Sequence, residues 1–501
     1  MELIDLQNIE TRELACNGCT NKCSVLRFKF PNGNISYAGN KCEKVFFSKN
    51  SVKTKGFNAF EVKNSILFST RITQIERINT DNTNKISENL SNPCYPCAKI
   101  GIPRILNIYE NFPFWKTLFE ECGFEVVLSP ESDMKLYQSG VGSVMSDNIC
   151  FPAKLAHGHI LALVEQKVDR IFYPIIPKDE KEFAGSNNSF NCPVVSGYPE
   201  VIRSAINPEE NFGIPFDKPV INFADEKVLK EQCLTYIEML WGTQMTQITQ
   251  IIADNTNENN EKISVNQCNP RYQRSIFNAA FEHANFIRKN YNLQFIENQQ
   301  SILQECIENG ELCFVVAGRP YHADPLVNQK VGQILSDLGV NVLTDDVFRT
   351  QMTRITQINA DNTKLKISEN QCNPTPPQPS PKGREFAAFQ SSTKSEKYAV
   401  PPPLEGVRGR WANLNIVSQW SYPNRVLQTA LETARLPQNI QMIQLNSFGC
   451  GPDSFFMEET GEILKAAGKN YTVLRIDEIS SAGSIRLRCR SLIESLKAKN
   501  I

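Results

Sequence analysis

The sequence lacks an excess of charge of either sign, because 53 lysine and arginine residues oppose 54 aspartate and glutamate residues and leave a net charge of −1. A balanced surface provides no electrostatic footprint for nucleic acid or for an anionic membrane. The chain also lacks an apolar run of about 18 residues, the length that a membrane-spanning helix requires. Its first residues lack the basic start and apolar stretch of a secretion signal. These absences predict a cytoplasmic protein that binds neither nucleic acid nor membrane.

Proline and glycine are not in excess, at 28 and 25 of 501 residues, which argues against collagen-like and wholly disordered classes. An apolar fraction of 41% suffices for the cores of about three domains of roughly 150 residues each. Cysteine, by contrast, is abundant, with 16 residues. Without an export signal, these cysteines are more naturally thiols or metal ligands than disulfides. Their positions therefore carry most of the functional information.

Three Asn-rich stretches share the skeleton TQI…DNT…KIS…NP and resemble nothing else in the chain. Their unequal separations exclude a solenoid, whose repeats recur at a fixed period. The third stretch continues into a proline-rich tract that cannot pack a core and is expected to be extended or disordered. We interpret the stretches as polar surface inserts at 71–97, 244–271 and 351–410; ordered functional arms are the alternative.

Between the inserts, apolar runs typical of buried strands alternate with helical patterns. In the clearest unit, the strand-like run ELCFVVAG is followed by a helical stretch that ends at Gly339 and then by a second strand-like run, VNVLTDD. Such alternation predicts parallel sheets. We therefore expect an α/β fold with two doubly wound Rossmann-like domains around a crevice, plus a Cys-rich N-terminal module. The expected parts are the module at 1–68, the first α/β domain at 99–243, a helical connection at 272–310, and the second α/β domain at 311–350 and 411–501.

Four cysteines near the N-terminus form a Cys-x2-Cys-x3-Cys-x18-Cys pattern, made by Cys16, Cys19, Cys23 and Cys42. The first three can wrap one ion or cluster, and the fourth can complete its shell. Four thiolates suit tetrahedral zinc or an iron-sulfur cluster, and the spacing does not choose between them. The alternative of four unrelated buried thiols fits poorly with their Asn, Gly and Lys neighbours. The pattern therefore predicts a metal site.

A further Cys-x2-Cys pair, Cys94 and Cys97, ends the first insert. The other two copies continue differently from the same Asn-Pro, so we interpret the pair as incidental, with a redox or metal role as the alternative. Cys268 and Cys372 also belong to inserts and are set aside.

Cys150, Cys192 and Cys450 form the more informative set. Cys150 is followed by Pro152, which suits the first turn of a helix, so its sulfur is expected at a helix N-terminus that favours thiolate. Cys192 follows the strand-like IFYPIIP, and Cys450 lies just beyond IQMIQLNSFG. All three are expected beyond the carboxyl ends of strands, where open α/β sheets form ligand crevices. Three such thiolates can hold an iron-sulfur cluster with one iron open to substrate or water; three buried structural cysteines are the alternative.

Arg319, His322 and Asp324 in AGRPYHADP lie between an expected strand end and a helix. This arrangement suits an anion such as a CoA phosphate or a thioester carbonyl. Turn and N-cap chemistry, with Asp324 ahead of Pro325, is an equal alternative.

His157 and His159 stand two residues apart on an expected helix, so they do not share a face as an i, i+4 metal pair would. A surface or cap-supporting role is the better interpretation. Glu110 is expected to cap a helix or to line the crevice, and Trp115 and Trp420 are expected in the core.

The chain carries, in order, the motifs GIPRILNIYENFPFW, NICFPAKLAHGHI, NCPVVSGYPEVI, VAGRPYHADPLVN, VSQWSYPNR, NSFGCGPDS and RIDEISSAGSIRLRCRSLI. Together they resemble the acyl-CoA dehydratase activase-related family, in particular its 2-hydroxyglutaryl-CoA dehydratase-like portion, the domain of unknown function 2229 region. The N-terminal CNGCTNKC…GNKCEK resembles the segment that precedes it. The resemblance implies a doubly wound α/β fold and 4Fe-4S chemistry in anaerobic bacteria. It makes Cys150, Cys192 and Cys450 the expected cluster ligands.

The resemblance also implies delivery of one low-potential electron to the thioester carbonyl of a 2-hydroxyacyl-CoA, which allows hydroxide to leave. The chain shows no GxxxxGK[ST] or GxGxxG loop, so ATP hydrolysis is expected from an activator on another chain. Leu326 and Ser418 stand where the family more often has acids, which weakens an acid-base role there. Three interpretations remain: an iron-sulfur dehydratase or reductase component, a non-catalytic electron-transfer or scaffold protein, and an insert-interrupted relic.

Overall fold

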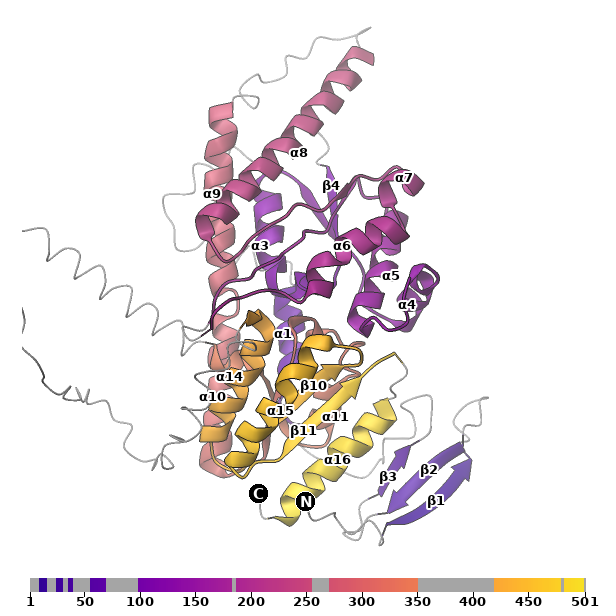
Figure 1. The fold of residues 1–501 in the computed structure, drawn as a ribbon, viewed down its shortest axis with the longest axis vertical. Helices are drawn as coiled ribbons and strands as arrows, with labels where there is room; N and C mark the ends of the chain where they lie inside the picture. The colour runs from indigo at the N-terminus through magenta and orange to yellow at the C-terminus, as the bar shows by residue number, and fades with distance from the viewer. Residues whose placement is uncertain are drawn as a thin grey trace, which may run out of the picture.

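The computed structural model describes residues 9–15, 24–29, 35–38, 55–68, 98–182, 186–254, 270–349, 419–478 and 482–499. Two parallel sheets, one in each half of the molecule, form its framework (Figure 1). The predicted α/β class with parallel sheets is therefore confirmed. Among the described helices, none is both long and apolar enough to cross a membrane.

The first sheet has the strand order β5-β4-β6-β7, and all its strands are parallel. Its strands are β4 (Lys99–Ile102), β5 (Glu125–Leu128), β6 (Arg170–Phe172) and β7 (Phe216–Asp217). The helices that connect them are α3 (Ile108–Glu121), α4 (Met134–Gly140), α5 (Phe151–Glu165), α6 (Pro193–Ala205) and α7 (Pro208–Phe212), with the short η4 (Val141–Ser143) between α4 and α5. Because β5 and β6 lie on opposite sides of β4, the connections leave the sheet in opposite directions, as in doubly wound folds.

The second sheet has the order β11-β10-β8-β9 and is also entirely parallel. Its strands are β8 (Cys313–Ala317), β9 (Asn341–Thr344), β10 (Ile440–Ser447) and β11 (Tyr471–Ile476). Its connections are η6 (Pro320–Ala323), α11 (Val331–Asp337), η7 (Asp345–Phe348), α14 (Ser421–Arg435) and α15 (Gly451–Ala466), and α16 (Ala482–Ala498) follows the last strand. In both sheets, the second strand in chain order lies on one side of the first strand, and the third and fourth strands lie on the other side of it. The two halves therefore repeat one topology.

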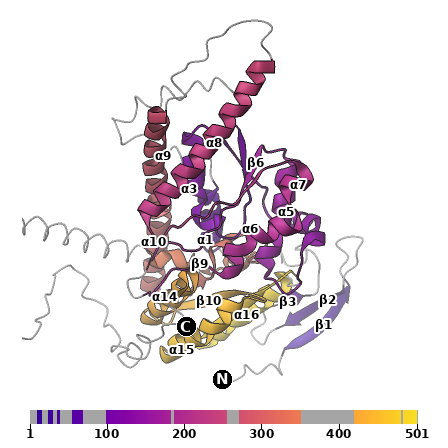
Figure 2. The ribbon, with the colours of Figure 1, turned by 45° about the horizontal axis from the view of Figure 1, so that its top comes forward.

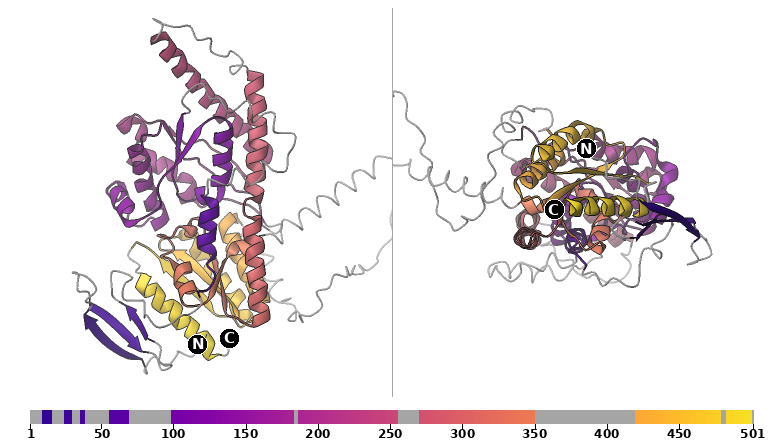
Figure 3. Two further views of the ribbon diagram at one scale, coloured as in Figure 1. Left: turned by 180° about the vertical axis from the view of Figure 1, so that it is seen from behind. Right: turned by 90° about the horizontal axis from the view of Figure 1, so that it is seen from below.

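Three long helices connect the halves: α8 (Glu226–Asp254), α9 (Pro270–Asn290) and α10 (Leu293–Asn309). Seen from behind, α9 and α10 follow one another along the same side of both sheets (Figure 3). The stretch expected to be a helical connection, 272–310, consists of these two helices. The backbone of α8 continues to residue 254, so the expected insert at 244–271 begins inside a helix.

The N-terminal part contains a small antiparallel sheet of β1 (Glu10–Ala15), β2 (Ser24–Lys29) and β3 (Ile35–Ala38), followed by α1 (Ala59–Leu67). The sheet lies beside α16 (Figure 2), where Arg490 Nη1 donates to Ile35 O at 2.6 Å. Several residues named above lie outside the described ranges: Cys16, Cys19, Cys23, Cys42, Cys94, Cys97, Cys268, Cys372 and Ser418. The expected inserts at 71–97 and 351–410 also lie outside them.

Aromatic side chains form the core between the first sheet and α3, α8 and α9. Trp115 has no exposed surface and packs edge-on against Phe172, with ring centroids 4.7 Å apart. Its predicted core position is confirmed. Trp420, however, is only half-buried and stacks on the exposed Phe455. The expectation for Trp420 was wrong because this residue lies at the outer start of α14.

Candidate functional site

A cysteine forms the N-cap of three helices that leave the carboxyl side of the two sheets. In each case a proline stands at the first or second helical position, where its fixed φ and missing N–H suit the start of a helix. The pairs are Cys150 with Pro152 on α5, Cys192 with Pro193 on α6, and Cys450 with Pro452 on α15. A helix N-terminus carries partial positive charge, so each thiol stands where a thiolate is favoured.

The loop before Cys450 touches the loop before Cys150, although the two loops belong to different sheets. Their closest approach is at Gly449, whose φ is +77°. A Cβ atom at Gly449 would lie 2.7 Å from the carbonyl oxygen of Asn148 and 3.9 Å from the backbone nitrogen of Cys150. Glycine is therefore required here by both the backbone conformation and the available space.

Tyr321 in η6 is buried, and the three cysteines are near enough to affect the pKa of its hydroxyl. Cys150, Cys192 and Tyr321 also belong to one apolar cluster that includes residues of both sheets. Cys150 and Cys192 thus share one buried cluster, and Cys450 is linked to them through the contact of its loop with the Cys150 loop; their joint role as ligands stays a prediction.

Burial favours the neutral form of two of the thiols, Cys150 and Cys450. It raises the pKa of Cys150 to about 11 and that of Cys450 to about 12. Arg319 opposes this effect at Cys450, because its Nη2 donates to Cys450 Sγ at 3.7 Å. The Arg319 guanidinium also forms a buried ion pair with Asp453, whose other oxygen accepts from Asn446 Nδ2 at 2.7 Å. A fixed positive charge therefore stands beside one of the three sulfur atoms.

The donor set of this site fits a cluster that binds each thiolate through a separate iron. Within the described ranges, no three His, Cys, Asp or Glu side chains approach closely enough to hold one metal ion together. A cluster does not require its cysteines to meet at one centre. A bound cation also holds its thiol ligands deprotonated, which overcomes the raised pKa of Cys150 and Cys450.

The three residues predicted to bind substrate are buried and occupied by contacts within the protein. His322 Nδ1 accepts from the Arg319 backbone N–H at 3.0 Å, and its Nε2 hydrogen-bonds with Ser447 Oγ at 3.0 Å. Burial lowers the pKa of His322 to about 3, so its imidazole is neutral. Asp324 accepts from the backbone N–H groups of Leu326 and Val327 at 2.8 and 3.2 Å. This is the turn chemistry expected as the alternative, and binding of substrate by these residues stays a prediction.

Residues 99–348 match the family model of the CoA enzyme activase uncharacterised domain, domain of unknown function 2229. These residues belong to that family. The match agrees with the resemblance in the sequence motifs and runs from β4 through the helical connection to η7. It contains Cys150 and Cys192, whereas Cys450 lies beyond it. No curated protein matches the chain.

Within the activase domain, both histidines of α5 are fully buried, so the predicted surface position is wrong. His157 hydrogen-bonds with Ser143 Oγ at 2.8 Å and Tyr198 OH at 3.1 Å. His159 hydrogen-bonds with Ser129 Oγ at 2.8 Å and, through its other nitrogen, with Ser132 Oγ at 3.0 Å. The spacing argument failed because the first ten residues of α5 are buried on every side. Burial lowers the pKa of His157 to about 4 and that of His159 to about 3.

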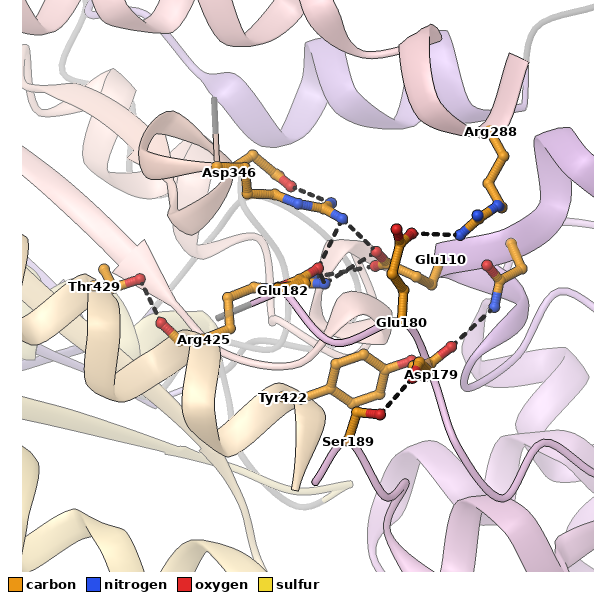
Figure 4. Close-up of polar contacts among 12 residues, drawn as sticks. Glu110, Asp179, Glu180, Glu182, Ser189, Arg288, Asp346, Tyr422, Arg425 and Thr429 are labelled. Carbon is orange, nitrogen blue, oxygen red and sulfur yellow. Dashed lines mark hydrogen bonds and ion pairs between the residues drawn. The ribbon is translucent and has the colours of Figure 1, made fainter. Parts of the chain in front are cut away.

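A buried ionic network joins the activase domain to α14 (Figure 4). Arg425 of α14 donates to Glu110 at 3.0 Å and to Glu182 at 2.5 Å, and Arg349 donates to the same two carboxylates at 2.8 and 2.9 Å. Arg349 also pairs with Asp346 at 3.1 Å. Although burial acts in the opposite direction, Arg349 and Arg425 lower the pKa of Glu110 to about 2. Glu110, expected as a cap or crevice residue, is therefore an ion-pair partner.

Asp179 forms a second polar contact between the two halves, also drawn in Figure 4. Its carboxylate accepts from Tyr422 OH of α14 at 2.9 Å and from Asn111 Nδ2 of α3 at 3.4 Å. Burial and the nearby charge of Glu110 raise the pKa of Asp179 to about 6. Sequence reasoning did not find Asp179 or Arg425. The only signal was that VSQWSYPNR, quoted for the family resemblance, ends in Arg425.

Proposed function

We propose that the chain is an iron-sulfur component of a 2-hydroxyacyl-CoA dehydratase or activase-type system, with a 4Fe-4S cluster on Cys150, Cys192 and Cys450. The observation that carries the proposal is that Cys150, Cys192 and Cys450 each N-cap a helix and that the loop before Cys450 contacts the loop before Cys150 at Gly449. Membership of residues 99–348 in the CoA enzyme activase domain family supports the same conclusion.

The chain's own residues would contribute binding and electrostatics. Helix N-termini and Arg319 stabilise negative charge on sulfur, and the apolar cluster around Cys150 and Cys192 excludes water. When bound, such a cluster would supply a low-potential electron and a Lewis-acidic iron to an acyl-CoA thioester. Cys450 is the most accessible of the three cysteines, and the exposed Phe448 and Phe455 flank it in sequence. Substrate or a protein partner is therefore expected at the Cys450 side.

A second metal site is proposed at Cys16, Cys19, Cys23 and Cys42, for zinc or another iron-sulfur cluster. The described strands support it through their register. Ala15, at the end of β1, pairs with Ser24, at the start of β2, and Ala38, at the end of β3, pairs with Leu26. The chain therefore leaves β1, enters β2 and leaves β3 at the same end of the small sheet. In sequence, Cys16, Cys19 and Cys23 lie between β1 and β2, and Cys42 follows β3.

The proposal includes an ATP-dependent activator on another chain and an acyl-CoA substrate. A second candidate function is non-catalytic electron transfer, or a scaffold that holds metal and docks partners. The burial of Arg319, His322 and Asp324 favours this second candidate, because none of the three is exposed to an acyl-CoA. Turnover of 2-hydroxyacyl-CoA by the iron-loaded protein with its activator separates the two, since a scaffold binds metal without converting substrate.

The test is anaerobic purification followed by measurement of iron, acid-labile sulfide and zinc, with electron paramagnetic resonance of the reduced protein. Wild type and Cys150→Ser are compared with Cys233→Ser, which replaces an equally buried cysteine in the aromatic core of the first half. We expect about four irons per cluster and a signal that collapses only in Cys150→Ser. Zinc alone, with no change in Cys150→Ser, would refute the cluster at the N-cap cysteines.

A further inference from the structure

Cys306 and Cys313 are neighbours at the amino-terminal edge of the second sheet, opposite the edge with the cysteine N-caps. Cys306 lies in the last turn of α10, and Cys313 is the first residue of β8. Gly310, with a φ of +67°, ends the helix between them, and Glu311 N donates to Cys306 O at 2.9 Å. This turn brings the two side chains into one buried apolar cluster.

The two sulfur atoms differ in their surroundings. Cys306 Sγ accepts from Asn341 Nδ2 at 3.2 Å, and Asn341 is the cross-strand partner of Cys313. Interaction with Cys313 and the Asn341 donor lower the pKa of Cys306, whereas interaction with Cys306 and burial raise the pKa of Cys313. The thiolate is the nucleophilic form of cysteine. Cys306 therefore has the surroundings of an attacking thiol, and Cys313 those of a neutral partner within reach.

We propose that Cys306 and Cys313 form a reversible disulfide when the protein encounters a peroxide, with Cys306 oxidised first. The Cys306 thiolate attacks one peroxide oxygen; an S–O bond forms, the O–O bond breaks, and one water leaves after protonation. The Cys313 sulfur then attacks the Cys306 sulfenic acid; the S–S bond forms, the S–O bond breaks, and a second water leaves. The two thiols lose two electrons and two protons, and the peroxide is reduced to two waters.

Access to the pair is provided by the turn above it. Both cysteines are buried, but residues 308–311 between them are exposed. Opening of one terminal helical turn is among the lowest-energy local motions of a folded protein. A molecule as small as hydrogen peroxide would reach Cys306 from the exposed turn without unfolding of the sheet.

The chain contains a matched internal control for this reaction. Cys122 and Cys233 are also buried and interact electrostatically, but they belong to the aromatic core of the first half. Burial raises the pKa of both thiols. Proximity alone predicts similar oxidation of both pairs, whereas activation of Cys306 predicts oxidation of the Cys306–Cys313 pair only.

The test treats the anaerobically purified, reduced full-length protein with hydrogen peroxide, quenches it at intervals, and alkylates the free thiols after denaturation. Glutamyl endopeptidase cuts at Glu308 and Glu311, so a disulfide is detected by mass spectrometry as two linked peptides that dithiothreitol separates. We expect free thiol at Cys306 and Cys313 to be lost first, while Cys122 and Cys233 stay reduced, because only Cys306 has a lowered pKa. Equal rates at the two pairs would overturn the proposal.

Three variants assign the roles. In Cys313→Ala, dimedone should trap a sulfenic acid at Cys306, and in Cys306→Ala the Cys313 thiol should stay free. Asn341→Leu retains both cysteines and should slow the formation of the disulfide, which keeps the test available if a cysteine variant does not fold. A dimedone adduct at Cys313 in Cys306→Ala, or an unchanged rate in Asn341→Leu, contradicts the proposed order of attack.

Discussion

Replacement of Arg425 by methionine should destabilise the protein strongly, because it leaves two buried carboxylates with one cation. Arg425 and Arg349 share Glu110 and Glu182, and the Arg425 side chain is 3% exposed. Although burial opposes the shift, folding lowers the pKa of Glu110 from 4.5 to about 2, and this net difference corresponds to about 3 kcal/mol of stability at neutral pH. Removal of one partner of a buried ion pair typically costs about 3 to 5 kcal/mol. We therefore expect Arg425→Met to lower the free energy of unfolding by about 3 kcal/mol or more.

The assay is urea unfolding followed by tryptophan fluorescence, to which the buried Trp115 contributes. Arg435→Met is the matched control on the same helix, because Arg435 pairs with Glu432 at 2.6 Å but is 46% exposed, and such pairs contribute about 1 kcal/mol or less. A carboxylate whose pKa is lowered by folding adds stability that is present above pH 4.5 and is lost as the pH falls towards 2. The cost of Arg425→Met should therefore be larger at pH 7 than at pH 3. Equal costs for the two arginine variants, or a cost of Arg425→Met that is independent of pH, would refute this reasoning.

Three further substitutions test other contacts. Folding raises the pKa of Asp179 from 3.8 to about 6, so the stability that this carboxyl contributes falls by about 3 kcal/mol as the pH rises between these values. Asp179→Asn should remove this loss. The measurement compares the denaturant midpoints of both proteins at pH 4 and pH 7. Gly158→Ala would place a Cβ atom 2.1 Å from Leu136 O, where α4 meets α5, and should lower the free energy of unfolding by about 1 to 3 kcal/mol, whereas Gly142→Ala, in open space, should not. Gly449→Ala should lower the iron content of anaerobically purified protein, since its Cβ atom would push the Cys450 loop away from the Cys150 loop; unchanged iron would contradict that geometry.

The parallel sheets could be predicted from the sequence because their strands are short apolar runs separated by helical patterns. CFVVA and IQMIQLNS form β8 and β10, and every residue of both strands is buried. The three N-cap cysteines could be predicted for a similar local reason, since a nearby proline marks the start of each helix. In all these cases the signal lies within a few residues of the feature it indicates.

The polar contacts between the halves could not be predicted in this way. Glu110 and Arg425 are 315 residues apart in sequence, and neither has a local pattern that identifies the other. His157 and His159 show the same limit, because their burial depends on which elements cover α5 and not on their spacing. The contact of Gly158 in α5 with Leu136 in α4 likewise depends on how closely the two helices approach, and helical periodicity does not indicate the distance between helices.

The position of Cys450 relative to the other two cysteines depends on these polar contacts. Apolar burial is non-directional, so the shared core of the two halves opposes their separation but fixes their relative orientation weakly. Hydrogen bonds and buried ion pairs require a defined geometry. Tyr109 OH donates to Asp324 at 2.6 Å, and Lys154 of α5 pairs with Glu478 beyond β11, so directional contacts connect the halves on the helices that surround the cysteines. In the proposed site, whose cysteines are divided between two sheets, these polar contacts therefore set the spacing of the thiols, and substitutions in the junction should change metal binding without altering any thiol.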